Sequence, residues 1–219
     1  AAQDTSGYPI AEAYLDISGS DALLFKGKAY DNYTYYIAGT AFFERDEWQE
    51  GSLYYDGVLY TGLSLKMELV QGKPVIFYKD LVFPIMPSPE RISWFTLGNS
   101  RFERLVRAND ESAVPETGFY QLAYAGSTSL WIKHEKEIKS EIRERQLRYW
   151  FEAKSTYYIE KDNEFHRIRG RGSLLRALAE HRNEIKAHLK DMDLSVRKNP
   201  ELAIREAMRY YDELKGWEQ

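Results

Sequence analysis

The chain has 219 residues, of which 43% are hydrophobic and 15% aromatic, so bulky aromatic side chains can fill a folded core and disorder is not expected. Its formal net charge of −4 gives no general attraction to phosphate backbones, which argues against a nucleic-acid partner. Cysteine is absent, and this excludes disulfides, thiolate metal ligands and cysteine nucleophiles.

Residues 1–21 are predicted to form an extended segment ahead of the folded body. The chain opens with a small, polar run over residues 1–7 that contains no methionine. Two origins fit this start: a mature end left by signal peptidase, which would mean export, or a boundary of the expressed chain. No apolar run approaches the roughly 18–20 residues of a membrane-spanning helix, so no membrane span is expected.

Residues 22–172 are predicted to form an antiparallel β domain. The aromatic-rich stretch 33–37 alternates with period two, which is typical of a strand. Asp56-Gly57 stands between two aromatic and aliphatic runs, and this pair is a strong hairpin signal, because a type I′ turn needs positive φ at both central residues. Asp162-Asn163 marks a second turn of this kind.

Further strands are predicted in hairpin order along the chain. They cover residues 63–69, 75–78, 81–85, 92–97, 102–106, 118–124 and 129–134. Consecutive antiparallel hairpins at this spacing predict a meander, which would form a curved sheet, a half-barrel or a sandwich. Residues 133–148 alternate densely between the two signs of charge, which fits either a long solvated strand end or an exposed helix.

The apolar period becomes helical in residues 173–219, which are predicted to pack on the β domain. Ser173 is predicted to cap the first helix, since serine accepts the free N–H groups of a first turn. The apolar stripe of this helix consists of Leu174, Leu178, Ile185 and Leu189.

A second helix is marked by its ends. Asn199 is placed to cap it, Pro200 occupies its first turn, and Gly216 is predicted to end it. Strands followed by helices define the predicted fold class as α+β, an antiparallel β-meander with two C-terminal helices.

No known catalytic or cofactor-binding motif is present. The sequence lacks a nucleophile elbow, a phosphate-binding loop and a dinucleotide fingerprint. His181, Glu184 and His188 would share one helical face and could hold a metal, but His181 also continues the apolar stripe, where an imidazole usually fills the edge of a core. We therefore expect no metal, no cofactor and no enzymatic activity.

The run Arg167, Arg169 and Arg171 is the most distinctive local feature. Alternate arginines on a strand point to one face, and the glycines that follow lead toward a helix N-terminus, whose free N–H groups favour anions. One interpretation is a contact site for a carboxylate, a phosphate or an acidic partner loop. The alternative is a solvated face whose arginines form ion pairs with neighbouring glutamates. Those glutamates are Glu160, Glu164 and Glu180.

Charge is unevenly divided along the chain. Residues 1–130 hold 10 Lys and Arg against 17 Asp and Glu, whereas residues 131–219 hold 20 against 17. The C-terminal part is therefore the more basic one and could dock an acidic partner.

Several of these patterns resemble a group of uncharacterised exported proteins of Bacteroidetes-type bacteria. The resemblance spans roughly residues 40–215 and is carried by the hairpin at 46–60, by Gly118-Phe119-Tyr120 with Ala125-Gly126, by 157–162, and by 201–214. It implies an exported, envelope-associated protein with a β-rich body. We therefore expect a location in the periplasm and an association with the outer membrane through a partner. It implies no catalytic residues.

The leading functional hypothesis is therefore a non-catalytic exported protein that acts through protein contacts, as an accessory or plug-like subunit of an outer-membrane transport or secretion complex. The alternative is a periplasmic module whose aromatic sheet face binds a small glycan or lipid. A hydrolase that uses dispersed carboxylates is a third hypothesis, but the sequence contains no motif that supports it.

Overall fold

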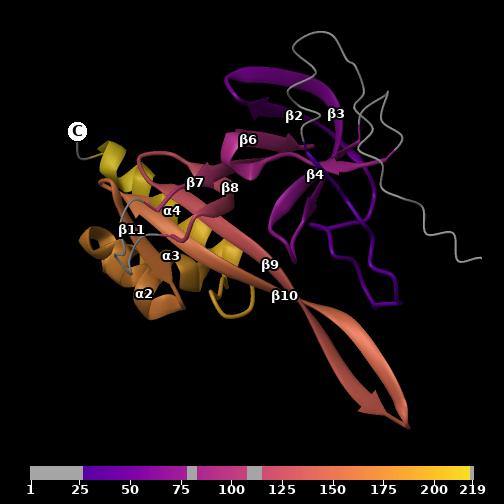
Figure 1. The fold of residues 1–219 in the computed structure, drawn as a ribbon. Helices are drawn as coiled ribbons and strands as arrows, with labels where there is room; N and C mark the ends of the chain where they lie inside the picture. Colours follow the sequence, from indigo (N-terminus) through magenta and orange to yellow (C-terminus); the bar gives the residue numbers. More distant parts are fainter. Residues whose placement is uncertain (1–26, 78–82, 108–114, 218–219) are drawn as a thin grey trace, which may run out of the picture.

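The described residues form one curved antiparallel sheet of eleven strands, followed by helices (Figure 1). This computed structural model describes residues 27–77, 83–107 and 115–217. The predicted α+β class and the strand-then-helix order are confirmed. The predicted extended segment, residues 1–21, lies outside the described residues, as does the start of the strand predicted at 81–85.

Neighbouring strands are antiparallel throughout, in the order β1-β5-β4-β3-β2-β6-β7-β8-β9-β10-β11. From β6 to β11 the spatial order is the chain order, which is the predicted meander. The strands are β1 (Lys28–Ala29), β2 (Gln49–Tyr55), β3 (Val58–Glu68), β4 (Lys73–Phe77), β5 (Ile85–Met86), β6 (Ile92–Leu97), β7 (Ser100–Leu105), β8 (Gly118–Ala125), β9 (Ser129–Arg143), β10 (Gln146–Lys161) and β11 (Glu164–Ile168).

The two predicted turn pairs form the expected hairpins. Asp56 and Gly57 join β2 to β3 with φ values of 54° and 83°. Asp162 and Asn163 join β10 to β11 with φ values of 52° and 64°. Positive φ at both central residues twists the chain in the sense that two neighbouring strands need, so these short signals determine the local fold.

The prediction of a strand at residues 33–37 is wrong. This segment makes no ladder, and only isolated bridges tie its neighbourhood to the sheet, at Ala38 opposite Trp150 and at Phe42 opposite Glu68. The alternating aromatic side chains instead contact distant residues: the Tyr33 hydroxyl donates to Glu68 at 2.9 Å, and its ring lies edge-on to another aromatic ring at 5.3 Å. Contacts with residues far away in the chain, and not the period-two alternation, therefore determine the path of this segment.

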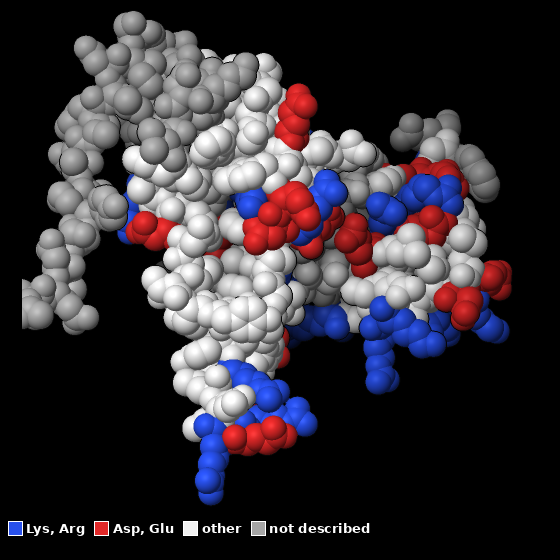
Figure 2. Space-filling model, turned by 90° about the vertical axis from the view of Figure 1, so that its right-hand side faces the viewer, with Lys and Arg blue, Asp and Glu red and all other residues white. Residues whose placement is uncertain are grey.

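The β9–β10 hairpin extends beyond the sheet as a two-stranded ribbon (Figure 1). The strand alternative for residues 133–148 is thus the correct one. Ile142 and Leu147 pair across the ribbon near its tip and are 78% and 54% exposed. Figure 2 shows positive and negative side chains mixed at this tip, the lowest part of the view, so the ribbon end offers no surface of a single charge.

The helices are α2 (Arg171–Ala177), the 3-10 turn η2 (Ala179–His181), α3 (Arg182–Asp191) and α4 (Pro200–Trp217). The long first helix predicted from one apolar stripe is broken at η2. Ser173 is not the N-cap, because α2 begins two residues earlier and Gly170 occupies the cap position. The second helix begins at Pro200 as predicted and ends one residue beyond Gly216.

Two large hydrophobic clusters, and a smaller third one of four residues, hold the described residues together. One lies along strands β2 to β8 and includes Leu53 and Phe95, both fully buried. The other packs β8 to β11 against the helices and includes Ile159, Ile204 and Tyr211. Burial of each such side chain contributes about 1.5–3 kcal/mol, so the helices are held to one end of the sheet, as Figure 1 shows.

Candidate functional site

The three predicted arginines lie at the point where the sheet passes into the helices. Arg167 is on β11 opposite Tyr158, Arg169 follows the end of that strand, and Arg171 opens α2. All three residues are exposed. The prediction that they alternate along one strand is wrong, because β11 ends at Ile168. They nevertheless remain close in the fold, since they flank a single turn.

The Ser173 side chain holds this turn. Its hydroxyl oxygen accepts the backbone N–H groups of Arg169 at 2.8 Å and of Gly170 at 3.1 Å, and its proton is donated to the Gly170 carbonyl at 2.8 Å. A serine at the third helical position therefore satisfies N–H groups that the start of α2 leaves free. These bonds fix the backbone of the turn that carries the arginines.

Two of the three glutamates expected to neutralise the arginines contact other residues. Glu180 forms an ion pair with Lys161 at 2.9 Å, and Glu160 accepts the indole N–H of Trp131 at 2.7 Å. Within the described ranges, none of the three arginines has a carboxylate oxygen within 4.0 Å. The solvated ion-pair alternative therefore does not describe these side chains.

Two adjoining hollows surround this turn, and we call them together the basic groove. The larger, of about 720 Å³, lies between the start of α2 and residues 189–197, which run from the end of α3 into the link to α4. The smaller, of about 300 Å³, runs along residues 154–157 of β10 toward the first turns of α4. They meet at Arg169, Gly170 and Val196, which line both.

The groove has a strongly positive lining. Its basic members are Lys154, Arg167, Arg169, Arg171, Lys190 and Arg197. Asp193 is the one carboxylate among the described lining residues. Six cations against one anion in a concave surface concentrate a positive potential, because field lines are focused between low-dielectric walls. Val196 and Pro200, both half-buried, add apolar surface to the wall.

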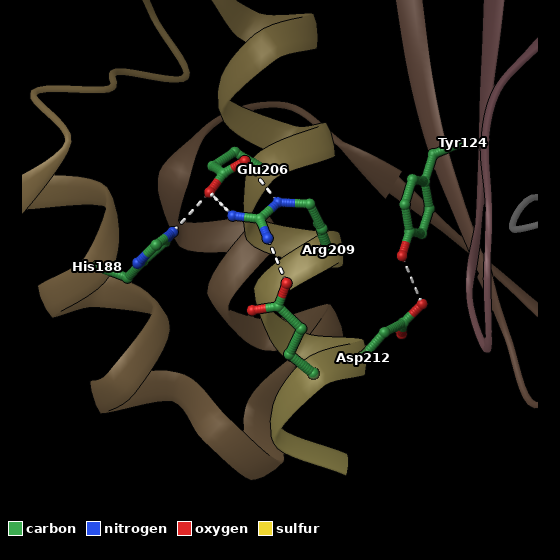
Figure 3. A network of polar contacts seen from close by, with 6 residues as sticks. Tyr124, His188, Glu206, Arg209 and Asp212 are labelled. Carbon is green, nitrogen blue, oxygen red and sulfur yellow. Dashed lines mark hydrogen bonds and ion pairs between the residues drawn. The ribbon is translucent and has the colours of Figure 1, made fainter. Parts of the chain in front are cut away.

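A polar network on α4 fixes the helices that form the groove (Figure 3). Glu206 accepts hydrogen bonds from His188 of α3 at 2.7 Å and from Arg209 at 2.6 and 3.0 Å. The bonds from Arg209, and then the one from His188, lower the pKa of Glu206 to about 2. The His188 ring also stacks on Tyr210 with 4.0 Å between the ring centroids. The network therefore locks α3 to α4 on both sides of the segment 189–197.

Asp212 fastens the same helix to the sheet. Its carboxylate accepts the Tyr124 hydroxyl at 2.8 Å, the Ser127 N–H at 3.0 Å and the Ser127 hydroxyl at 2.5 Å (the Tyr124 bond is drawn in Figure 3). We call this set of bonds the Asp212 latch. It depends on close approach at the turn between β8 and β9, where a Cβ at Gly126 would lie 2.0 Å from the Asp212 Oδ2 atom.

We expect Gly126→Ala to lower the free energy of unfolding by about 1–3 kcal/mol, the usual cost of overpacking, because the added methyl group forces the Asp212 latch apart. The measurement is equilibrium urea unfolding. Gly172→Ala on α2 is the matched control, since a Cβ there meets no atom within 4 Å and alanine favours a helix. Equal losses in the two variants would contradict the role of the latch.

A second polar cluster lies within the sheet. His134 contacts the Ser155 hydroxyl through Nδ1 at 3.1 Å and the Gln121 side-chain oxygen through Nε2 at 2.7 Å. Burial, with a smaller effect of Lys136, lowers the pKa of His134 to about 4. An imidazole with this pKa is a weak general base at neutral pH, so we assign the Ser155–His134 contact a structural role in joining β8, β9 and β10.

The histidines considered for metal binding have other contacts. The His181 ring is buried and lies 5.5 Å from the Tyr211 ring, and His188 is bound to Glu206. Among the residues with described positions, no group of three or more His, Asp or Glu side chains is arranged to hold a metal ion. Nor does any described helix combine the length and the apolar character that crossing a membrane requires.

Sequence reasoning located the arginines but missed Lys154, Lys190 and Arg197. The basic excess of residues 131–219 was the one available signal for them. Fold and site together define an α+β protein with an eleven-stranded antiparallel sheet and a basic groove at its helical end. The chain matches no protein-family model, no curated protein and no solved structure. The resemblance to exported envelope proteins therefore stays a prediction.

Proposed function

We propose that this protein is a non-catalytic accessory subunit that binds an acidic segment of a partner protein in its basic groove. The observation that carries the proposal is the set of six cationic side chains around one concave surface, none of which has a carboxylate oxygen within 4.0 Å among the described residues. Unpaired, exposed guanidinium groups bind carboxylates through paired N–H donors, so an acidic peptide suits this surface.

The groove favours an acidic partner over the other ligands considered. Aromatic side chains of the kind that a glycan or lipid site needs are used in packing here: Tyr55 is fully buried, Tyr30 is 8% exposed, and Tyr54 stacks on Trp94. The projecting ribbon carries charges of both signs at its tip (Figure 2). The groove, by contrast, has six cationic lining residues against one carboxylate, and electrostatic complementarity to such a lining speeds association and selects the partner.

The proposal also includes a cellular location for the protein. The resemblance to exported proteins supports a periplasmic subunit that is held at the outer membrane by its partner. Fractionation of cells that express the full-length gene from its own promoter tests this part separately. Recovery with the periplasm or the washed outer membrane would support it, and recovery with the cytoplasm would refute it.

The binding test uses a fluorescein-labelled octapeptide of alternating Glu and Val, called here the acidic probe. We expect the double variant Arg169→Glu/Arg171→Glu to weaken its binding at least about tenfold at low salt, since two attractive contacts become repulsive. Fluorescence anisotropy gives the dissociation constants. Binding by the unmodified protein should also weaken as ionic strength rises past about 0.1 M, where the Debye length falls to about 10 Å.

The matched control is Arg205→Glu, which reverses an exposed charge on α4 that does not line the groove. It should change binding of the acidic probe by less than about twofold. A labelled octapeptide of alternating Lys and Val should not bind the unmodified protein. No binding of the acidic probe, or equal losses in the Arg169/Arg171 variant and the Arg205 variant, would refute the proposed function.

A further inference from the structure

The outer edge of β10 is paired at two places with a gap between them. The N–H of Ala38 donates to the Tyr149 carbonyl at 2.9 Å, and the N–H of Phe151 donates to the Ala38 carbonyl at 3.1 Å. Farther along, β11 pairs with β10, beginning at Tyr157 opposite Ile168. Residues 152–156 lie between these two contacts and have no neighbouring strand on this edge within the described chain.

Strand geometry shows which backbone groups face the gap. The register between β9 and β10 is continuous, so the N–H and C=O groups of one residue point to the same side and alternate residues point outward. Tyr149 and Phe151 bond outward to Ala38, and therefore Ala153 and Ser155 also direct their backbone groups outward. Both residues are exposed. The gap thus presents two donors and two acceptors to solvent.

The smaller hollow of the basic groove runs along this gap. Its lining includes Lys154, Ser155 and Thr156 from β10, with Arg167 and Arg169 at the end where β11 leaves the sheet. Pro200 supplies apolar surface from α4. From Phe151 to Tyr157 an extended chain covers about 20 Å, which is room for a strand of a few residues.

We propose that the acidic partner segment binds as an added β-strand on the outer edge of β10, in the place that β11 vacates after Ile168. This inference rests on the proposed function and specifies its mode. Backbone bonds to Ala153 and Ser155 hold the segment in register, and the acidic side chains contact Arg167 and Arg169. An extended peptide that completes an open sheet edge gains affinity from main-chain bonds and specificity from side-chain contacts.

The test is amide hydrogen exchange of the unmodified, isotope-labelled protein, followed by NMR with and without the acidic probe at saturating concentration. We expect the exchange of the Ala153 and Ser155 amides to slow by at least about tenfold, because their N–H groups become hydrogen-bonded. The inward-facing amides of Lys154 and Thr156 serve as internal controls, since their bonds to β9 exist without the probe. Their exchange should change far less.

A variant provides the second measurement. Ala153→Pro removes one outward N–H group without removing a bond to β9, and proline is tolerated where the N–H of an edge strand faces solvent. We expect this variant to bind the acidic probe about fivefold or more weakly, because one main-chain hydrogen bond is lost. Ala153→Thr keeps the N–H group and should bind the probe as the unmodified protein does. Thermal unfolding of both variants checks that the fold is kept. If Ala153→Pro does not fold, the hydrogen-exchange measurement on the unmodified protein alone decides the proposal.

The outcomes separate the two proposals. Binding that depends on Arg169 and Arg171 but leaves the exchange of Ala153 and Ser155 unchanged would overturn strand addition and leave the proposed function standing. Failure of the acidic probe to bind the unmodified protein would overturn both. Slowed exchange at Ala153 and Ser155 together with sensitivity to the arginines would support both.

Discussion

Replacing Glu68 by alanine should lower the free energy of unfolding by about 2–4 kcal/mol, because two hydrogen-bond donors lose a buried acceptor at about 1–3 kcal/mol each. Glu68 is fully buried at the end of β3. Its carboxylate accepts the Tyr33 hydroxyl at 2.9 Å and the Gln71 N–H at 2.5 Å. Alanine would remove the acceptor of both bonds, and the loss is larger for the half-buried Tyr33 hydroxyl than for Gln71, which is exposed and can reach water.

Electrostatics add to the expected loss. The Lys136 side chain donates to the carbonyl oxygens of Thr40 and Phe42 at 2.8 and 2.6 Å, and burial lowers the pKa of its ammonium group while Glu68 opposes that shift. Without Glu68 this partly buried cation loses its stabilising charge. Because Tyr33, Thr40 and Phe42 all belong to the segment before β2, Glu68→Ala should also release that segment from the sheet.

Equilibrium chemical unfolding measures the effect of Glu68→Ala. Glu68→Gln keeps the size and one oxygen acceptor, so it should lose about half as much as alanine does. Glu47→Ala removes an exposed carboxylate and should change the free energy of unfolding by less than about 0.5 kcal/mol. Equal, small losses for Glu68→Ala and Glu47→Ala would show that the buried carboxylate does not hold the segment.

The second large effect is expected for Gly51→Ala, with a loss of about 3 kcal/mol or more, at the upper end of overpacking costs. A Cβ at Gly51 would lie 1.9 Å from the backbone oxygen of Thr96 and 2.8 Å from the Leu65 Cδ1 atom. The obstacle is backbone on β6 and a buried core side chain, so neither can move aside easily. The register between β2 and β3 shifts directly after this residue.

Gly118→Ala is the matched control for Gly51→Ala, because both glycines lie in strands and a Cβ at Gly118 meets no atom closer than 3.9 Å. Alanine there should be neutral or slightly stabilising, since it reduces the entropy of the unfolded chain. Thermal and urea unfolding of the two variants give the comparison. A stable Gly51→Ala protein with unchanged unfolding would contradict the close approach of β2 and β6.

The parts of the fold that the sequence predicts correctly are those set by neighbouring residues. The turns at Asp56-Gly57 and Asp162-Asn163 need positive φ at two adjacent positions, and few residue types adopt it without strain. Pro200 likewise marks the start of α4. The stretch 33–37 fails for the opposite reason: its period fits a strand, yet contacts with β3 and β10 determine its path.

The site was only partly predictable for the same physical reason. The spacing of arginines at every second residue identified Arg167, Arg169 and Arg171, which lie close together in the sequence. Lys190 lies at the end of α3 and Arg197 in the link from α3 to α4, and they reach the groove only because Glu206 and Asp212 fix α4 in place. The open edge of β10 depends on where β11 ends and where Ala38 docks, and no local pattern encodes either position.

The most direct test of the basic groove is NMR mapping of the acidic probe on the unmodified protein. If the groove is the binding site, the backbone amides of residues 167–171 and 189–197 should show the largest shift changes, and these should fade as salt is added beyond about 0.15 M. Residues 141–148 at the ribbon tip should be unaffected. Shift changes confined to the ribbon tip, or spread evenly over exposed Lys and Arg residues, would contradict the assignment of the groove.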